Sequence, residues 1–206
     1  MAGFSPEVEQ RIRALGGTVT PCGGGLLECL TAVRFQVPPA GTRPCFGYPY
    51  TPGRANCDGQ DAPAFLRHDF ADYLEAEQID AARESGSMAL SDVSYPFVQW
   101  KVELFTPWEA ETADNEEWEG TIDDTAIAEL TGRPSPQIIF IANTGSWPNY
   151  YFCVGDDPYT TDPAVYSTDH EVLFSEVEQQ GHLSDFLADL LTEHEFNTIV
   201  AQIVNG

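Results

Sequence analysis

The sequence predicts an α+β fold: a single domain in which helices pack against one antiparallel, twisted sheet. Three observations support this. The chain has 206 residues, which suits one domain with a hydrophobic core of its own. Several short segments alternate apolar and polar residues and are separated by short turns, which favours antiparallel strands. Apolar residues recur at helical spacing near both ends of the chain, so amphipathic helices are available to cover the sheet.

The first predicted element is a helix over residues 5–15. Ser5 is placed to cap it, and Pro6 suits the first helical position because its missing N–H has no partner there anyway. A Gly-rich turn follows at residues 23–25. Alternation over residues 33–37 then predicts a strand, which ends at a pair of prolines.

The middle of the chain is less regular. Residues 38–62 are rich in Pro, Gly and aromatic residues, which predicts a long ordered loop, and residues 63–84 are predicted to be helical. Residues 98–104 alternate strictly, from Val98 to Leu104 on one face, and predict a strand with one buried and one exposed face. A short helix is predicted over residues 121–130.

The last third predicts a hairpin and a strand meander. Residues 138–142 and 150–154 are apolar runs joined by a polar turn, and residues 164–167 and 172–174 are candidates for two more short strands. An amphipathic helix is then predicted over residues 183–191.

A second apolar stripe over residues 196–203 would lie roughly opposite the first on one continuous helix. A break is therefore expected. Thr192 and Glu195 have the spacing of a capping box, so we predict two short helices that meet at an angle.

The charge is strongly one-sided. The chain has 33 acidic and 9 basic residues and a formal net charge of −24. Such a surface repels nucleic-acid phosphates and anionic lipids and attracts basic proteins, so we expect neither nucleic-acid nor membrane binding. The chain's first residues lack the features of a secretory signal, and no apolar run approaches the ~20 residues of a membrane span. We therefore expect a cytoplasmic protein.

The five cysteines, Cys22, Cys29, Cys45, Cys57 and Cys153, are odd in number and form no Cys-x-x-Cys motif. This pattern argues against a disulfide framework or a zinc ribbon. We expect free, partly buried thiols in a reducing cytosol.

Catalytic signatures are weak. The sequence contains no Gly-x-Ser-x-Gly, His-Glu-x-x-His or phosphate-loop motif. One enzyme alternative is a cysteine hydrolase, with Cys22 or Cys57 as nucleophile and His68 or His170 as base.

Two acid-His-acid triplets contain possible metal ligands, but adjacent side chains point in different directions, so solvated turn carboxylates are the better interpretation. These triplets are Asp169-His170-Glu171 and Glu193-His194-Glu195. We expect no catalytic residues, no metal and no cofactor.

The acidity is concentrated between Glu103 and Glu129, where ten acids and no base occur, with Trp108 and Trp118 interleaved. Carboxylates bind guanidinium and ammonium groups, and Trp often anchors a desolvated contact. We predict an acidic docking surface for a basic protein. Its expected contact residues are Glu109, Glu111, Asp114, Glu116, Glu117, Trp118 and Glu119. A merely solvated face, including salt adaptation, is the alternative.

Three segments resemble the SUKH superfamily. Residues 138–157 (IIFIANTGSWPNYYFCVGDD) look like its central hairpin, residues 163–171 (PAVYSTDHE) match its Asp-His-Glu-like element, and residues 183–191 (LSDFLADLL) match its closing helix. The resemblance covers roughly residues 137–192. It implies a single α+β domain without catalytic residues, in which Asp169, His170 and Glu171 are structural. Many bacterial members are immunity proteins that bind and neutralise toxins, often nucleases.

Together these points predict one SUKH-like domain over residues 1–206. It has the N-terminal helix 5–15, an acidic insertion at about 106–125, and the core hairpin and C-terminal helices within 137–204. The expected function is that of a bacterial immunity protein, a monomer or weak homodimer, that occludes a basic, nuclease-type toxin stoichiometrically. The alternatives are the cysteine hydrolase and an acidic regulatory scaffold without a toxin partner.

Overall fold

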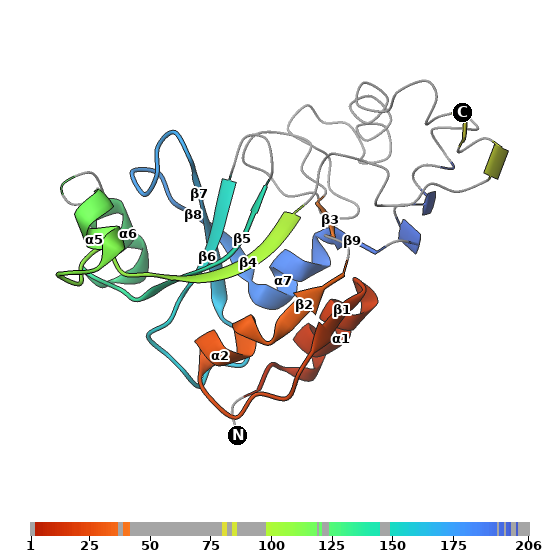
Figure 1. The fold of residues 1–206 in the computed structure, drawn as a ribbon, viewed down its shortest axis with the longest axis horizontal. Coiled ribbons are helices and arrows are strands. Elements are labelled where there is room, and N and C mark those ends of the chain that lie inside the picture. The colour runs from red at the N-terminus through yellow and green to blue at the C-terminus, as the bar shows by residue number, and fades with distance from the viewer. Residues whose placement is uncertain are drawn as a thin grey trace.

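The alternating segments of the sequence assemble into a five-stranded antiparallel sheet in the order β4-β5-β6-β7-β8 (Figure 1). The computed structural model describes residues 3–36, 39–41, 80–81, 84–85, 98–118, 120, 124–144, 149–192, 194–195, 197–198 and 201. The strands are β4 (Val98–Phe105), β5 (Ile138–Thr144), β6 (Asn149–Val154), β7 (Ala164–Asp169) and β8 (Glu178–His182). The predicted α+β class is confirmed.

Two short antiparallel ribbons accompany this sheet. In one, β1 (Gly17–Val19) pairs with β2 (Val33–Phe35). In the other, β3 (Ala40–Gly41) pairs with β9 (Leu190–Leu191), which brings together the first fifth of the chain and its last tenth. The sequence did not predict β1, β3 or β9, because strands of two or three residues are too short to show a period.

Helices α1 (Pro6–Ala14), α2 (Leu26–Thr31) and α7 (Leu183–Ala188) cover one side of the sheet, called here the first face (Figure 1). The predicted N-terminal helix is confirmed, with Val8 and Ile12 fully buried. The Ser5 Oγ accepts a hydrogen bond from the Val8 N–H at 3.3 Å, as expected of the cap. The larger hydrophobic core lies between these helices and the sheet.

The opposite side, the second face, carries helices α5 (Ala113–Trp118) and α6 (Asp124–Thr131) and the loop after β7. A smaller core there consists of Phe105, Ile127, Ile138, Phe152 and Phe174. The face of β4 that was predicted to be exposed is therefore covered at the C-terminal end of the strand, where Phe105 is buried. Conversely Leu104, expected to be buried, is 39% exposed; it lies on an edge strand, beyond a register shift between Trp100 and Glu103.

The prediction of a strand at 172–174 is wrong. These residues form a turn in which Phe174 has a φ of 62° and donates its N–H to the Thr168 Oγ1 at 2.8 Å. The fifth strand is instead β8, whose sequence Glu-Gln-Gln-Gly-His is polar. An edge strand with largely solvated side chains does not alternate apolar and polar residues, so the sequence pattern does not predict it.

The predicted helix over 183–191 is too long, because α7 ends at Ala188 and Leu190–Leu191 forms β9. The capping box beyond it is confirmed. The Thr192 N–H donates to Glu195 Oε2 at 2.7 Å, and the Glu195 N–H donates to Thr192 Oγ1 at 3.2 Å. Residues 194–195 and 197–198 are helical, as the second stripe predicted.

Other predictions fall largely outside the described residues. Of the predicted loop 38–62, only residues 39–41 are described. Of the predicted helix 63–84, only residues 80, 81 and 84 are described, and these are helical. Helix α6 begins at Asp124 within the predicted span 121–130.

Candidate binding surface for a basic partner

The acidic segment folds as a turn followed by α5 and lies against the second face of the sheet. The side chains of Glu109, Glu111, Glu116 and Glu117 are exposed, as a contact role requires. Glu119 lies outside the described residues. The segment is therefore folded, and it presents at least four carboxylates to solvent.

Asp114 has a structural partner. Its Oδ2 accepts hydrogen bonds from the Thr106 N–H at 2.8 Å and from the Thr106 Oγ1 at 3.1 Å. The Thr112 hydroxyl donates to the Thr106 carbonyl at 2.9 Å, and the Asn115 amide donates to the Pro107 carbonyl at 2.8 Å. These bonds fix the turn between β4 and α5, so Asp114 positions the segment as well as adding charge.

The two tryptophans attach this segment to the sheet. Trp108 and Trp118 are half-buried and pack against the second-face core. The Trp118 ring meets Phe105 edge to face, with centroids 6.4 Å apart. Trp118, which we expected to be a partner contact, is thus first an internal anchor, and only its exposed part is available to a partner.

A groove of about 700 Å³, called here the second-face groove, opens beside α5. Its lining combines aromatic rings, carboxylates and a single lysine. The lining residues are Lys101, Glu103, Leu104, Phe105, Asp114, Glu117, Trp118, Phe140, Ala142, Asn143, Tyr150, His170 and Leu173. The acidic helix therefore forms one wall of a concave site whose floor is the sheet.

The groove favours a cation. Three carboxylates face one ammonium, and Lys101 Nζ is already paired with Glu103 Oε1 at 2.6 Å. Aromatic faces attract cations, and carboxylates accept paired N–H bonds from guanidinium. An arginine or lysine side chain of a partner thus finds both kinds of group within one groove.

Sequence reasoning missed the strand residues of this groove. Phe140 and Tyr150 come from β5 and β6, and their ring centroids lie 5.5 Å apart. In the sequence each is simply one more apolar residue of a strand. Strand alternation could have found them, because alternate residues of a strand point to opposite faces of the sheet. Phe140, Tyr150 and Phe152 all lie on the face opposite to Ile139 and Tyr151.

The expectation of free thiols is wrong for two cysteines, because Cys22 and Cys29 form a disulfide. The Gly-rich turn and the short helix α2 bring the two within reach, a proximity that a count of cysteines does not show. Cys153 is free and buried as expected, and burial, followed by the charge of Asp162, raises the pKa of its thiol. Cys45 and Cys57 lie outside the described residues.

The residues of the hydrolase alternative are not brought together where they are described. Cys22 packs against the first-face core, whereas His170 lines the groove on the second face. Cys57 and His68 lie outside the described residues.

The triplet Asp169-His170-Glu171 forms a turn. Asp169 Oδ1 accepts the Glu171 N–H at 2.8 Å and lies 3.2 Å from His170 Nδ1. Within the described part of the chain, no three His, Cys, Asp or Glu side chains are grouped as a metal site would require. Glu193 of the other triplet is outside that part.

The described helices include none with the length and apolar character needed to cross a membrane. Comparison with protein-family models, with curated proteins and with solved structures gave no match.

Proposed function

We propose that this protein is an immunity protein that binds a basic, nuclease-type bacterial toxin and neutralises it by occlusion, acting as a monomer or weak homodimer. One observation carries the proposal: the second-face groove joins the carboxylates of Glu103, Asp114 and Glu117 to an aromatic floor. The exposed acids of α5 extend this surface beyond the groove. The SUKH-like segments of the last third of the chain favour the same function.

In this proposal an arginine or lysine of the toxin enters the second-face groove and stacks on the rings there, while its charge meets Asp114 or Glu117. Bonds between charged groups in such a partly desolvated site are stronger than those at an open surface. The net charge of −24 steers a basic partner toward the surface and makes association fast and salt-sensitive. No catalytic step is required.

The test is co-expression with the toxin encoded beside this gene, with wild-type protein and two matched variants. Glu116→Gln with Glu117→Gln removes two charges from α5, whereas Glu7→Gln with Glu9→Gln removes two from α1 on the first face. We expect the α5 variant to bind the purified toxin about tenfold more weakly and to protect cells poorly, a loss of about 1.4 kcal/mol. The α1 variant should protect fully. Equal protection by the two variants, or survival of cells that lack this protein, contradicts the proposal.

The absence of catalysis is also a proposal, supported by the positions of Cys22, which packs against the first-face core, and His170, which lines the groove on the second face. Iodoacetamide labelling at neutral pH tests it. We expect no cysteine to react faster than an ordinary exposed thiol, because a catalytic cysteine needs a lowered pKa. A hyper-reactive Cys57 would instead favour the hydrolase alternative.

Cytoplasmic action follows from neutralising a nuclease where its substrates are. In a reducing cytosol the Cys22–Cys29 pair is expected as a dithiol, since disulfides persist mainly in oxidising compartments. Thiol trapping in freshly lysed cells checks the location: both cysteines should be alkylated. A disulfide that survives rapid trapping places the protein elsewhere.

The neighbouring genes separate the scaffold alternative from the toxin-binding function, since a scaffold needs no adjacent toxin gene.

A further inference from the structure

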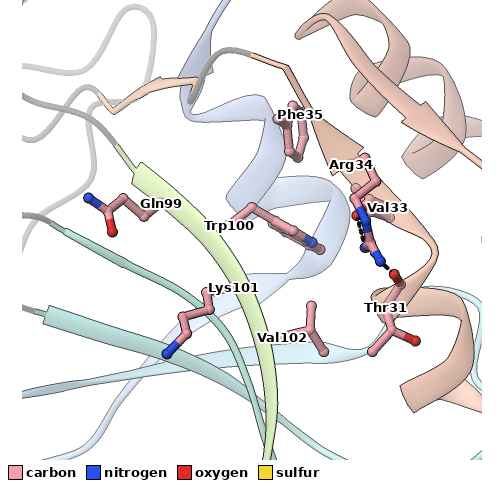
Figure 2. A pocket seen from close by; sticks show the side chains of 8 residues that line it. All are labelled: Thr31, Val33, Arg34, Phe35, Gln99, Trp100, Lys101 and Val102. Carbon is pink, nitrogen blue, oxygen red and sulfur yellow. Dashed lines mark hydrogen bonds between the residues drawn. The ribbon is translucent and has the colours of Figure 1, made fainter.

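Two strand edges face each other across a second groove, of about 360 Å³, called here the edge groove (Figure 2). In the described part of the chain β2 pairs only with β1 and β4 pairs only with β5, so each strand has a second edge with no neighbouring strand. Both of these edges border the groove. The lining residues are Thr31, Val33, Arg34, Phe35, Gln99, Trp100, Lys101 and Val102.

The floor and the rim of the edge groove differ in chemistry, as strand alternation requires. Phe35, Trp100 and Val102 are partly buried and pack against the first-face core, and the Phe35 and Trp100 rings lie 5.7 Å apart. Arg34 and Lys101 are exposed and belong to the opposite side of their strands. The floor is therefore apolar and aromatic, and the rim is basic and polar.

Backbone groups are directed into the same space. The Val98 N–H donates to the Pro39 carbonyl at 3.1 Å and so points away from β5; alternation directs the Trp100 N–H and C=O the same way. On β2, the Arg34 guanidinium donates to the carbonyls of Val33, at 2.8 Å, and of Thr31. Arg34 thus caps part of a strand edge with its own side chain, which is one way in which proteins keep such an edge closed.

The edge groove differs in charge from the rest of the molecule. The chain has 33 acids and 9 bases, yet the eight lining residues include two bases and no acid. The other described basic residues, Arg11, Arg13, Lys101 and Arg133, each pair with a carboxylate. Arg34 has no carboxylate partner among the described residues. Its guanidinium can therefore leave the carbonyls of Thr31 and Val33 and bind a carboxylate of a partner instead.

We propose that the edge groove binds an extended peptide segment of another protein by strand addition between β2 and β4, with apolar side chains on the floor alternating with acidic side chains toward Arg34 and Lys101. Main-chain bonds supply affinity in this mode, and alternate side chains supply specificity. The added strand joins the β1–β2 ribbon to the five-stranded sheet, so that the two form one continuous sheet. At a strand cross-section of ~48 Å², the groove takes about two to three residues, similar to the length of β2. This site takes the opposite charge to the proposed toxin surface and shares only Lys101 with the lining of the second-face groove.

The probe is a fluorescein-labelled octapeptide in which valine alternates with glutamate, followed by fluorescence anisotropy. We expect saturable binding, weakened at least tenfold by Arg34→Met and also weakened by Lys101→Met. Arg13→Met, which removes an equal charge from α1, should bind as wild type does. A valine–lysine octapeptide is attracted by the acidic second face instead, so Arg34→Met should not weaken its binding. Circular dichroism checks that all variants are folded. No binding to wild type, or equal binding by the Arg34 and Arg13 variants, overturns the proposal.

Hydrogen exchange supplies a second readout. The peptide should slow exchange of the Trp100 amide, because that N–H faces the groove, and should leave the amides of α5 unchanged. If the Trp100 amide is already slow without peptide and the peptide does not bind, the protein's own chain fills the groove and the proposal is wrong.

Discussion

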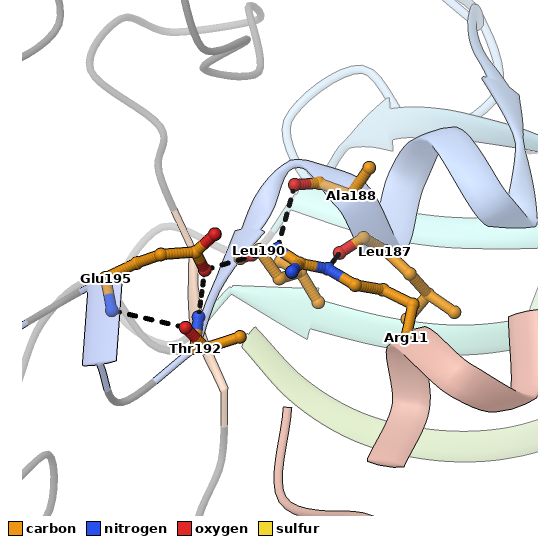
Figure 3. A network of polar contacts seen from close by, with 6 residues as sticks. All are labelled: Arg11, Leu187, Ala188, Leu190, Thr192 and Glu195. Carbon is orange, nitrogen blue, oxygen red and sulfur yellow. Dashed lines mark hydrogen bonds and ion pairs between the residues drawn. The ribbon is translucent and has the colours of Figure 1, made fainter. Parts of the chain in front are cut away.

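Arg11 joins the two ends of the chain through one side chain (Figure 3). Its Nε donates to the Leu187 carbonyl at 3.0 Å, and its Nη2 donates to the Ala188 carbonyl at 3.1 Å and to that of Leu190. The same nitrogen lies 3.4 Å from Glu195 Oε2. The last carbonyls of a helix have no partners within it, and a cation at that end also interacts favourably with the negative end of the helix dipole. Arg11, which belongs to α1, therefore caps the C-terminal end of α7.

Replacing Arg11 by Met tests this role. The apolar stem is kept, but the carbonyls of Leu187 and Leu190 lose a charged donor. We expect the free energy of unfolding in urea to fall by about 2 kcal/mol, since bonds to charged groups contribute roughly 1.5–3. Arg13→Met serves as the control, because Arg13 makes an exposed pair with Glu9 that is worth little. Equal losses in both variants would show that the Arg11 bonds stabilise the protein no more than the exposed Arg13–Glu9 pair does.

Glu195 makes the same region sensitive to pH. Burial opposes its ionisation, but hydrogen bonds from Thr192 and the charge of Arg11 outweigh burial and lower the pKa of its carboxyl from the ordinary 4.5. A group whose folded pKa is lowered stabilises the protein above its unfolded pKa, and that contribution is lost as pH falls through the folded pKa. The stabilisation should thus be complete near neutral pH and decline below about pH 4.5.

The corresponding prediction compares wild type with Glu195→Gln. At pH 7 the variant should be less stable, and below the folded pKa the two should converge, because wild type then also lacks the charge. Urea melts between pH 3 and pH 7 measure the gap between them. A gap independent of pH would show that the ionisation of Glu195 does not contribute.

At the scale of elements, the disulfide stabilises α2 in the oxidised protein. It has six residues and no side-chain cap, and a helix this short is not stable by itself. Cys29 is buried within α2, and its bond to Cys22 ties the helix to the Gly-rich turn before it. The bond closes a short loop, with a sequence separation of 7.

Removing the disulfide with Cys22→Ala and Cys29→Ala should lower stability by about 2.5 kcal/mol, the chain-entropy estimate for so short a loop. Dithiothreitol should lower the thermal midpoint of wild type toward that of the variant and leave the variant unchanged. If dithiothreitol lowers both midpoints equally, the effect has another source, and the disulfide does not stabilise α2.

Element prediction succeeded where one face of a segment is clearly apolar. Helix α1, strand β4 and the hairpin of β5 and β6 were predicted close to their observed bounds. Strand β8 and helices α5 and α2 were missed. Neither β8 nor α5 has a continuous buried face, since β8 is a polar edge strand and α5 has no buried residue. Helix α2 does bury Leu26, Cys29 and Leu30, but its six residues are too few to show a helical period. Such elements form because neighbouring parts of the fold supply partners for their backbones.

At the scale of the whole molecule, charge opposes compactness. With a net charge of −24, the folded state brings like charges together, and salt screens their repulsion. We expect the thermal midpoint to rise between 10 mM and 500 mM NaCl. The rise should be larger than that given by an uncharged solute of equal osmolality. A flat or falling midpoint would show that the fold already separates its charges well enough.

The same property predicts opposite salt responses at the two grooves. The second-face groove binds a cation in the field of the whole molecule, so salt should weaken its complex. An acidic peptide approaches the edge groove against that field, so salt should speed its association while weakening its local contacts with Arg34 and Lys101. Association and dissociation rates of the octapeptide at two salt concentrations test this difference. Identical responses of a basic partner and the acidic octapeptide would contradict it.

The candidate surface was predictable in part. A run of ten acids without a base located the acidic surface, since charge needs no tertiary context to be counted. The roles within it were not predictable. Asp114 and Trp118 have their partners, Thr106 and Phe105, in strand β4 or just beyond it, and only the packed structure showed that both residues first serve the fold.

By itself, the sequence determined the fold class, the main strands, the first helix, the capping box and the excess of acid, because each follows from local periodicity or from composition. The tertiary structure alone decided which strand edges lack a neighbour, which cysteines pair, and which face of the sheet becomes a groove. These properties depend on contacts between residues far apart in the chain, such as β3 with β9 and Arg11 with α7. A pattern read over a dozen residues does not contain such contacts, because register and docking are fixed only when the whole core packs.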